Sequence, residues 1–306
     1  MAVKGRFAPS PTGRMHAGNI FAYLMAWLCA HAQGGSIVLR VEDLDVERSR
    51  ADYADQILRD FEFLGLTWDE GPYYQQGRDD FYREAFDELS RKGLVYPCFC
   101  TRMSLKALSA PHWGEKQVYP GICRNLSSGE VQELMAQRNP AWRLRVPDAR
   151  YEFVDAVQGP YGQNLEDECG DFVIRRSDGL FAYQLASVLD DAEQGVDNVV
   201  RGVDLITSTP QQMYLQDVLG LSGCTYAHVP LIVSKPGRRL SKRDHDASLD
   251  ELVSRFGSPE GVIGHIAFIT GLVDTDEPCS CEELLERFEA DTLSELFEDK
   301  IQIQWR

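Results

Sequence analysis

The sequence predicts an α/β protein built on a parallel sheet, with an inserted segment and a mostly helical C-terminal part. Three observations lead to this prediction. Short apolar runs alternate with amphipathic helical patterns over residues 4–96 and again over 171–219, which is typical of parallel strands joined by helices. A cysteine-containing stretch at 97–170 interrupts the alternation, and helical patterns dominate after residue 234.

The first half of the alternation contains two predicted strands and three predicted helices. Residues 4–8 can form a short strand, and residues 36–41 (SIVLRV) have the apolar run of a buried strand. Between them, the apolar residues of 17–28 fall on one helical stripe, which a pair of glycines ends. Similar stripes at 54–64 and 82–89 predict two further helices.

The interrupting stretch has its own pattern, and the alternation resumes after it. It holds a helical piece near 128–137 and strand-like runs at 141–147 and 151–157. Residues 171–182 are expected to form a hairpin with Asp178-Gly179 at its turn. We then expect, in chain order, a helix from Gln184, a strand ending near Arg201, a helix over 209–219 and helices started by Ser248, Ser258 and Ser280.

The composition describes a folded, acidic protein. Hydrophobic residues make up 43% of the 306, which is enough for a packed core. The 48 acidic and 31 basic residues give a formal net charge of −17, which argues against a protein that coats phosphate backbones without specificity. A local basic site remains compatible with that charge. Because the first residues resemble no signal peptide, and no apolar run reaches about 18 residues, we expect a cytoplasmic location.

The segment 5–19 (GRFAPSPTGRMHAGN) combines a strand end, a Pro- and Gly-rich loop and a helix start. A helix N-terminus offers free backbone N–H groups and the positive end of the helix dipole, so an anion can bind there. His16 and Asn19 are three residues apart and therefore share one face. Either a phosphate site or an ordinary capped helix with a solvent-facing histidine accounts for this pattern.

The segment 234–244 (SKPGRRLSKRD) is unusually basic for this chain. It contains five cations within nine residues, namely Lys235, Arg238, Arg239, Lys242 and Arg243. A cationic loop with a glycine in it can close on a polyphosphate and stabilise the charge that builds up during phosphoryl or nucleotidyl transfer. A solvated basic loop is the alternative explanation.

Three charged residues stand at the predicted ends of strands. Arg6 precedes the first loop, Glu42 follows the second strand, and Arg201 ends a later one. Ligands of open α/β sheets bind outside the carboxyl ends of strands, so these side chains can converge. Two arginines can hold the two carboxylates of an acidic amino acid, and Glu42 can hold its ammonium group. Taken singly, each arginine could instead belong to a structural ion pair.

The two loops together resemble the signature pair of class I aminoacyl-tRNA synthetases. His16-Ala17-Gly18-Asn19 resembles the HIGH motif, and the segment 239–243 (RLSKR) resembles the KMSKS loop. Both depart from the family pattern, since only the His and Gly of the first and the Ser-Lys of the second are retained. The segments RFAPSPTG, LRVEDLD, FAYQLASVLDD and RGVDLITSTPQQ further resemble the catalytic core of glutamyl-tRNA synthetases, in the same order, over residues 4–250.

This resemblance implies a Rossmann-type catalytic domain and a set of site residues. Around glutamate it implies Arg6, Phe7, Ala8, Pro9, Ser10, Glu42, Tyr183 and Arg201. For ATP, accompanied by Mg²⁺, it implies Thr12, His16, Gly18, Asn19, Ser241 and Lys242. His16, Asn19 and Lys242 are the expected catalytic residues of this set, because they can stabilise charge on the leaving pyrophosphate.

A metal site is predicted in the interrupting stretch. Cys98, Cys100 and Cys123 are clustered in a chain that we expect to be reduced, and thiolates are the preferred ligands of structural zinc. From the residues alone, His112 is the candidate for the fourth ligand, and three unliganded thiols are the alternative. The short glutamyl-queuosine branch of the family has Tyr-x-x-x-Cys here, so the resemblance favours Tyr119 and one structural Zn²⁺ per chain.

The short C-terminal part determines which branch the chain resembles. About 60 residues follow Lys242, and the segment 274–299 has eleven acidic residues and one arginine. We therefore expect a helical stem-contact-like module without an anticodon-binding domain, as in the glutamyl-queuosine branch. That resemblance implies glutamate activation by ATP without tRNA, and transfer to the queuosine base in the anticodon of aspartate tRNA.

Two alternatives and a domain division complete the expectations. The chain could instead charge the 3′ end of a tRNA, as a truncated glutamyl-tRNA synthetase, or be a non-catalytic RNA-binding relative. We expect a monomer with no membrane partner. The predicted division is a first catalytic half at 1–96, a zinc-binding insert at 97–170, a second catalytic half at 171–233 and the loop with the helical module at 234–306.

Overall fold

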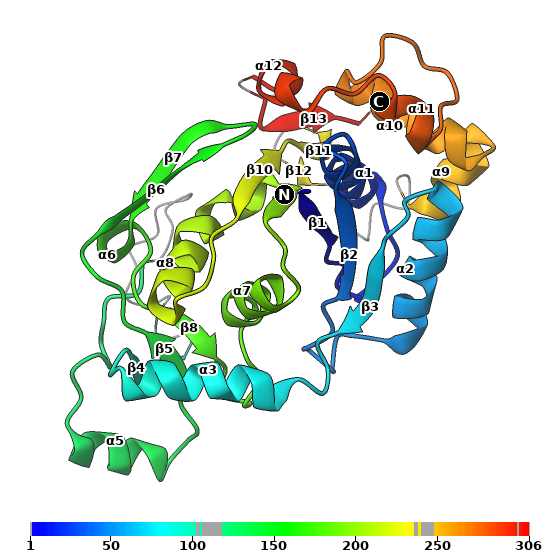
Figure 1. The fold of residues 1–306 in the computed structure, drawn as a ribbon. Helices are drawn as coiled ribbons and strands as arrows, with labels where there is room; N and C mark the ends of the chain where they lie inside the picture. Colours follow the sequence, from blue (N-terminus) through cyan, green and yellow to red (C-terminus); the bar gives the residue numbers. More distant parts are fainter. Residues whose placement is uncertain are drawn as a thin grey trace.

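The fold is an α/β arrangement with parallel strands at its centre, which confirms the predicted fold class (Figure 1). The structure is a computed structural model that describes residues 2–101, 105, 118–235, 238–239, 248–298 and 300–305. Strands β1 (Lys4–Phe7), β2 (Ser36–Val41) and β3 (Glu70–Tyr74) pair in parallel in that order. Strands β9 (Asn198–Gly202) and β10 (Thr225–Val229) form a second parallel pair.

The two parallel units meet along β1. The backbone N–H of Asp197, just before β9, donates to the carbonyl of Lys4 at 3.1 Å, and the backbone N–H of Lys4 donates to the Asp197 carboxylate at 2.8 Å. The carboxyl ends of β1, β2 and β9 are consequently brought to one edge, where ligands of such sheets bind.

Alternation along β1 and β2 gives the sheet two different faces. Gly5, Phe7, Ile37 and Leu39 face the helix α1 (Ala17–His31), and a methyl group on Gly5 would meet the side chain of Ala30 at 3.3 Å. The side chains at the alternate positions of the strands, including Arg6, face the helix α7 (Tyr183–Glu193) instead. This period of two separates an apolar face from a charged one.

The remaining helices of the catalytic core lie close to their predicted positions. They are α2 (Ala51–Leu64), α3 (Asp79–Arg91) and α8 (Thr209–Leu219). The 3₁₀ helix η1 (Val203–Ser208), directly before α8, is not among the predicted elements. Gly65 and Gly220 end α2 and α8 in the left-handed conformation, at φ 74° and 67°, which costs glycine nothing because it has no Cβ. Among the described residues, no helix has the length and apolar character needed to span a membrane.

The interrupting stretch forms an antiparallel sheet and a separate hairpin. Strands β4 (Val95–Cys98), β5 (Ala141–Leu144) and β8 (Phe172–Arg175) make the sheet, with α5 (Ser128–Met135) beside it. Strands β6 (Arg150–Asp155) and β7 (Gly159–Asn164) make the hairpin, followed by the short helix α6 (Leu165–Glu168). The end of this hairpin joins the core, because the N–H of Ala156 donates to the carbonyl of Tyr226 in β10 at 2.9 Å.

The hairpin predicted at 171–182 is formed in a short version, in which the Arg176 N–H donates to the Leu180 carbonyl at 2.8 Å and the Ala182 N–H donates to the Ile174 carbonyl at 2.9 Å. Gly179 has φ 93°, and its N–H donates to the Arg176 carbonyl, as a tight turn requires. The returning segment, however, contributes a single bridge between Arg175 and Phe181, and β8 pairs with β5 instead. The ring of Phe181 is buried against Tyr82 and Phe86, and this packing directs the chain into α7 rather than along β8.

The C-terminal part is helical, but it also completes a small sheet that the sequence patterns did not predict. Helices α9 (Leu249–Phe256), α10 (Pro259–Thr270), α11 (Cys281–Leu285), η3 (Ala290–Thr292) and α12 (Leu293–Leu296) follow one another. The last strand, β13 (Gln302–Gln304), pairs in parallel with β11 (Leu231–Lys235), whose other edge meets β12 (Arg238–Arg239). A three-residue strand is too short for a recognisable period.

The C-terminal helices are part of the main core. Phe297 is fully buried, and its ring meets that of Phe21 in α1 edge-on at a centroid distance of 5.8 Å. The C-terminal segment therefore supports the helix that begins at the HIGH-like motif.

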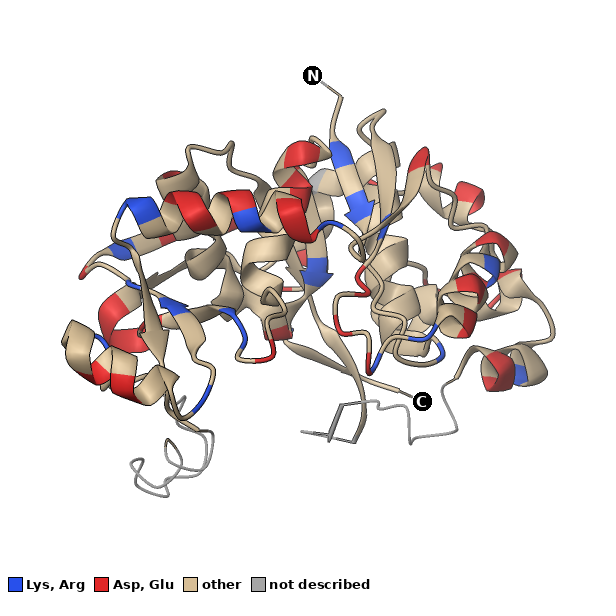
Figure 2. Cartoon of the chain, turned by 90° about the horizontal axis from the view of Figure 1, so that it is seen from below, with Lys and Arg blue, Asp and Glu red and all other residues tan. Residues whose placement is uncertain are grey.

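The acidic residues are spread widely over the molecule. Figure 2 shows them on helices at both sides of the chain.

We predict that Phe297→Ala lowers the free energy of unfolding by about 3–5 kcal/mol, because it removes a fully buried ring and leaves a cavity against α1. Urea denaturation measures this loss. Ile301→Ala is the matched control, since that side chain is 58% exposed and its removal should cost much less. Equal losses in the two variants would contradict the assignment of Phe297 to the core.

Candidate active site

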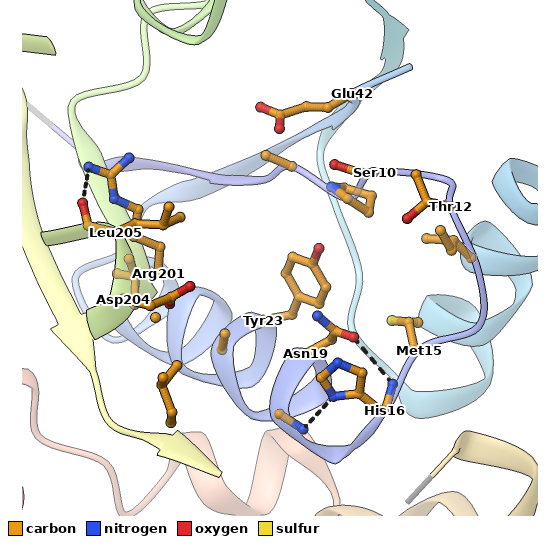
Figure 3. A pocket seen from close by; sticks show the side chains of 18 of the residues that line it. Ser10, Thr12, Met15, His16, Asn19, Tyr23, Glu42, Arg201, Asp204 and Leu205 are labelled. Atoms are coloured by element: carbon orange, nitrogen blue, oxygen red, sulfur yellow. Dashed lines mark hydrogen bonds between the residues drawn. The ribbon is translucent and has the colours of Figure 1, made fainter. Parts of the chain in front are cut away.

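A cavity of about 530 Å³ lies at the shared edge of the parallel strands. The loop after β1, the start of α1, the end of β2, the start of α7 and the end of β9 all contribute to its wall. Figure 3 shows Arg201 on one side of the hollow and Ser10 and Thr12 on the opposite side, with Tyr23 and Asn19 between them. Residues from five separate segments thus converge on one space.

The start of α1 is pre-organised by reciprocal capping. His16 Nδ1 accepts a hydrogen bond from the N–H of Gly18 at 3.2 Å, and the Asn19 side-chain oxygen accepts from the N–H of His16 at 3.3 Å. This arrangement fixes both predicted side chains at the helix N-terminus, where they line the cavity (Figure 3). The positive end of the helix dipole favours an anionic group at that position.

Arg6 is held by a buried carboxylate. Its Nε lies 2.9 Å from an Asp191 carboxylate oxygen, and Arg40 Nη1 lies 2.8 Å from the same oxygen. Arg40 also lies 3.3 Å from Glu42, and its side chain has no solvent exposure. One carboxylate of α7 therefore joins two arginines that come from neighbouring strands.

The charges in this cluster stabilise one another. Burial works against the charge of Arg6, but Asp191, Tyr183 and Glu42 together outweigh it and raise the pKa of the guanidinium. Burial likewise disfavours ionised Asp191, yet the two arginines lower the pKa of its carboxyl below the ordinary value. The pKa of Glu42 is raised by burial, which Arg40 and Arg6 offset only in part. A cationic ligand group beside Glu42 would stabilise its ionised form.

Arg201 has a different environment, although it is as buried as Arg6. It donates from Nε to His228 Nε2 at 3.1 Å, from Nη1 to the Tyr183 hydroxyl at 3.2 Å and from Nη2 to the Thr209 hydroxyl at 2.8 Å. All of these acceptors are neutral groups. Within the described residues, no carboxylate lies at ion-pairing distance from Arg201. Arg201 thus faces the cavity without an ion-pair partner among the described residues.

Most of the predicted substrate residues line this one cavity, namely Arg6, Ala8, Pro9, Ser10, Thr12, His16, Gly18, Asn19, Glu42, Tyr183 and Arg201. Phe7 does not. Its ring is fully buried and stacks on Phe61 at a centroid distance of 4.7 Å, because alternation along β1 turns it toward α1. Ser241 and Lys242 lie outside the described residues, as does His112.

Several residues of the site were not found from the sequence. Tyr23 and Asp204 line the cavity, and Asp191 and Arg40 support it from behind. A signal for Asp191 was available, since two consecutive carboxylates, Asp190 and Asp191, stand in an otherwise apolar helical stretch. Tyr23 gave no signal, because a tyrosine on an apolar helix stripe is an ordinary core residue.

The predicted thiol cluster is formed. The sulfur atoms of Cys98, Cys100 and Cys123 all lie within 4.8 Å of one another. The Tyr119 hydroxyl oxygen lies 3.4 Å from the Cys98 sulfur and 3.7 Å from that of Cys100, and the Arg143 guanidinium lies over its ring at 3.6 Å. Burial raises the pKa of Cys100 to about 11. A cluster with several thiolates therefore needs a cation, and this donor set can bind a metal ion.

The chain is similar to proteins of known class. Its residues 2–304 match the family described as tRNA synthetases class I (E and Q), catalytic domain. It is 44% identical to a glutamyl-Q tRNA(Asp) synthetase of Nitratidesulfovibrio vulgaris, over 89% of this chain and 87% of the relative. A protein of the same name from Symbiobacterium thermophilum is 43% identical over 93% of this chain and 92% of its own length.

Solved structures agree with this similarity. A glutamate tRNA ligase from Elizabethkingia meningosepticum, solved in complex with its amino acid, superposes with a TM-score of 0.82 at 25% identity. The superposition covers all of this chain and 67% of that ligase. A glutamate-tRNA synthetase from Elizabethkingia anophelis superposes with a TM-score of 0.81, also at 25% identity, over 68% of its length.

We predict that Arg40→Met lowers the free energy of unfolding by about 3–5 kcal/mol, because Glu42 loses its ion pair with Arg40, and Asp190 and Asp191 keep only Arg78 and Arg6 as cationic partners. Arg48→Met is the matched control, since Arg48 is 75% exposed and its ion pair with Asp45 should contribute at most about 1 kcal/mol. Denaturant titrations of both variants measure the two losses in free energy of unfolding. A similar small loss in each would show that the buried cluster contributes little to stability.

Proposed function

The chain belongs to the class I tRNA synthetases for glutamate and glutamine, and we propose that it is a glutamyl-Q tRNA(Asp) synthetase. It activates L-glutamate with ATP and transfers the glutamyl group to the queuosine base of aspartate tRNA. The observation that carries this proposal is the single cavity shared by Arg6, Glu42, Arg201 and the capped start of α1. This cavity combines the groups that an acidic amino acid and a nucleotide need.

The amino acid is recognised by charge. Arg201 and Arg6 bind the two carboxylates of glutamate, because guanidinium groups form paired hydrogen bonds with carboxylates. Glu42 binds the ammonium group, which keeps this buried carboxyl ionised. Tyr183 helps to orient Arg201 through its hydroxyl. Ala8, Pro9 and Ser10 form the adjacent wall, and Phe7 supports it from the core.

The nucleotide is recognised at the start of α1. Thr12, His16, Gly18 and Asn19 line the cavity where the helix dipole favours phosphate. Ser241 and Lys242, outside the described residues, complete this side in our proposal through the KMSKS-like loop. Part of the triphosphate charge is neutralised by the Mg²⁺ that the nucleotide carries.

The reaction proceeds in two steps. An α-carboxylate oxygen of glutamate attacks the α-phosphorus of ATP, the bond to the bridging oxygen of pyrophosphate breaks, and glutamyl-adenylate forms. His16, Asn19 and Lys242 stabilise the charge that moves onto the departing phosphates. A hydroxyl of the queuosine cyclopentene ring then attacks the acyl carbon, releases AMP and loses its proton. No nucleophile from the protein is required.

The rest of the chain supports this core. We propose that Cys98, Cys100, Tyr119 and Cys123 hold one structural zinc ion, which on binding would cross-link the segment 97–170. The segment 234–306 supplies the KMSKS-like loop and a helical module that contacts the tRNA stem. The contact between Arg14 and Asp250, at 2.6 Å, ties this module to the nucleotide loop.

The proposal predicts glutamate-dependent exchange of pyrophosphate into ATP in the absence of tRNA. Arg201→Leu should lower kcat/KM for glutamate about 10- to 150-fold, since it removes charged hydrogen bonds to the substrate. Arg83→Leu is the control, because Arg83 is exposed on α3 and away from the cavity. The assay is ATP–pyrophosphate exchange at varied glutamate.

The tRNA step has its own test. With labelled glutamate and ATP, aspartate tRNA that carries queuosine should be labelled, and the same tRNA without queuosine should not. Labelling that removal of the 3′-terminal adenosine of the tRNA abolishes would instead identify a synthetase acting on that end. Absence of exchange and of labelling would identify a non-catalytic relative.

We predict that Cys98→Ala loses the zinc of the purified protein and destabilises the segment around it, because one of the proposed ligands is removed. Metal analysis by mass spectrometry gives the zinc content per chain. Cys169→Ala, which lies outside the cluster, should keep the full amount. A Cys98→Ala protein with one zinc per chain would refute this ligand set.

A further inference from the structure

His228, a buried residue behind the cavity wall, determines how the Arg201 guanidinium is held. Arg201 in β9 and His228 in β10 are direct neighbours in the parallel pairing, so their side chains stand on the same face. His228 is fully buried and does not line the cavity. Its Nε2 accepts a hydrogen bond from Arg201 Nε at 3.1 Å. This hydrogen bond therefore holds the guanidinium through Nε, the nitrogen nearest the Arg201 backbone, and not through Nη1 or Nη2.

Asp155 determines the form of the imidazole ring. Its carboxylate lies 2.5 Å from His228 Nδ1, and the same carboxylate accepts the backbone N–H of His228 at 3.0 Å. It is anchored by two further backbone N–H groups, those of Val157 and Gln158, at 3.0 and 2.9 Å. Because a carboxylate only accepts, the ring hydrogen resides on Nδ1, and Nε2 keeps the lone pair that Arg201 needs.

The ring also stays neutral. Burial lowers the pKa of His228, the nearby Arg201 charge lowers it further, and Asp155 opposes both without reversing the shift. The other side chains in contact with the ring are uncharged, since Thr209 Oγ1 lies 3.3 Å from Nε2 and the rings of Tyr226 and Phe153 lie at centroid distances of 6.2 Å. The Asp204 carboxylate acts in the same direction as Asp155, and the pKa of His228 stays lowered nevertheless. A neutral acceptor fixes Arg201 without cancelling its charge.

The second substrate arginine provides a contrast within the same cavity. Arg6 is held at the same atom, Nε, but by the Asp191 carboxylate, so an ion pair already balances its charge. Arg201 differs in having only neutral partners among the described residues. An anionic ligand group consequently gains more from Arg201 than an isosteric amide would.

We propose that His228, oriented by Asp155, is a positioning residue that aims Arg201 and preserves its charge for a carboxylate of the amino acid substrate. This inference rests on the proposed function. It assigns to the Asp155–His228 pair the choice of a carboxylate over an amide in that part of the cavity. Asp155 comes from the β6–β7 hairpin, so the segment between the catalytic halves takes part in substrate selection.

Two near-isosteric substitutions separate the two halves of this contact. In His228→Gln, the amide oxygen can take the place of Nε2 and still accept from Arg201. In His228→Asn, the shorter amide can take the place of Nδ1 and still bind Asp155, but the acceptor for Arg201 Nε is lost. We expect His228→Asn to raise the KM for glutamate about 10- to 100-fold, the effect of losing one charge-assisted hydrogen bond. His228→Gln should stay within about threefold of the wild type.

A structural role alone would not give this pattern. In ATP–pyrophosphate exchange, His228→Asn should leave the KM for ATP and kcat within about threefold of the wild type. It should also lower the ratio of kcat/KM for glutamate over glutamine, while His228→Gln should preserve that ratio. Equal glutamate KM values in the two variants, or a parallel rise in the KM for ATP, would overturn the positioning role.

The tautomer provides a second test that needs no substitution of His228. In wild-type protein labelled with ¹⁵N-histidine, NMR should show the His228 ring protonated at Nδ1 and free at Nε2. Asp155→Asn should shift the ring toward the Nε2-protonated form, because the amide can donate to Nδ1, and should raise the KM for glutamate as His228→Asn does. A wild-type ring protonated at Nε2 would contradict the proposal even if the variants failed to fold.

The two proposals fail in distinguishable ways. Wild-type protein that exchanges no pyrophosphate with glutamate would refute the proposed function itself. Wild-type exchange together with unchanged glutamate selectivity in His228→Asn would refute only the role of His228. Thermal unfolding of each variant shows whether a loss of activity reflects the contact or the fold.

Discussion

The ion pair between Arg6 and Asp191 is the interaction on which the rest of the site depends. An arginine that faces a buried cavity carries a large desolvation cost, and the Asp191 carboxylate offsets it from the opposite layer. The same carboxylate also holds Arg40, so one residue of α7 joins β1, β2 and the helix that covers them. The position of α7 in turn determines where Tyr183, at its first turn, meets Arg201. Substrate recognition and the packing of the sheet therefore share one set of contacts.

The cavity combines rigid supports of two kinds. On the side that we propose for the amino acid, each arginine is fixed through its Nε, by a charged partner for Arg6 and by a neutral one for Arg201. On the side that we propose for the nucleotide, the capping of α1 by His16 and Asn19 fixes the helix start through hydrogen bonds with backbone N–H groups. The difference has a physical reason. Carboxylates need an available positive charge, whereas phosphate can be held by backbone N–H groups and the helix dipole.

Parts of the chain that are distant in sequence meet behind this cavity. The β6–β7 hairpin delivers Asp155 to His228, and the C-terminal helices pack Phe297 against α1. The interrupting stretch is consequently tied to the catalytic core as well as carrying the thiol cluster. The antiparallel sheet of that stretch includes β4, which spans the predicted limit at residue 97, and β8, which lies beyond the predicted limit at residue 170.

The sequence alone determined the α/β alternation, the positions of most helices and many of the groups that line the cavity. These features are encoded locally, in periodicity, in capping residues and in charged residues at strand ends, such as Arg6, Glu42 and Arg201. Only the tertiary structure decided that β8 pairs with β5, that β13 completes a sheet with β11 and that Phe7 turns into the core. The same is true of the partners Asp191 and His228, because such contacts join residues more than 20 positions apart and depend on how layers pack.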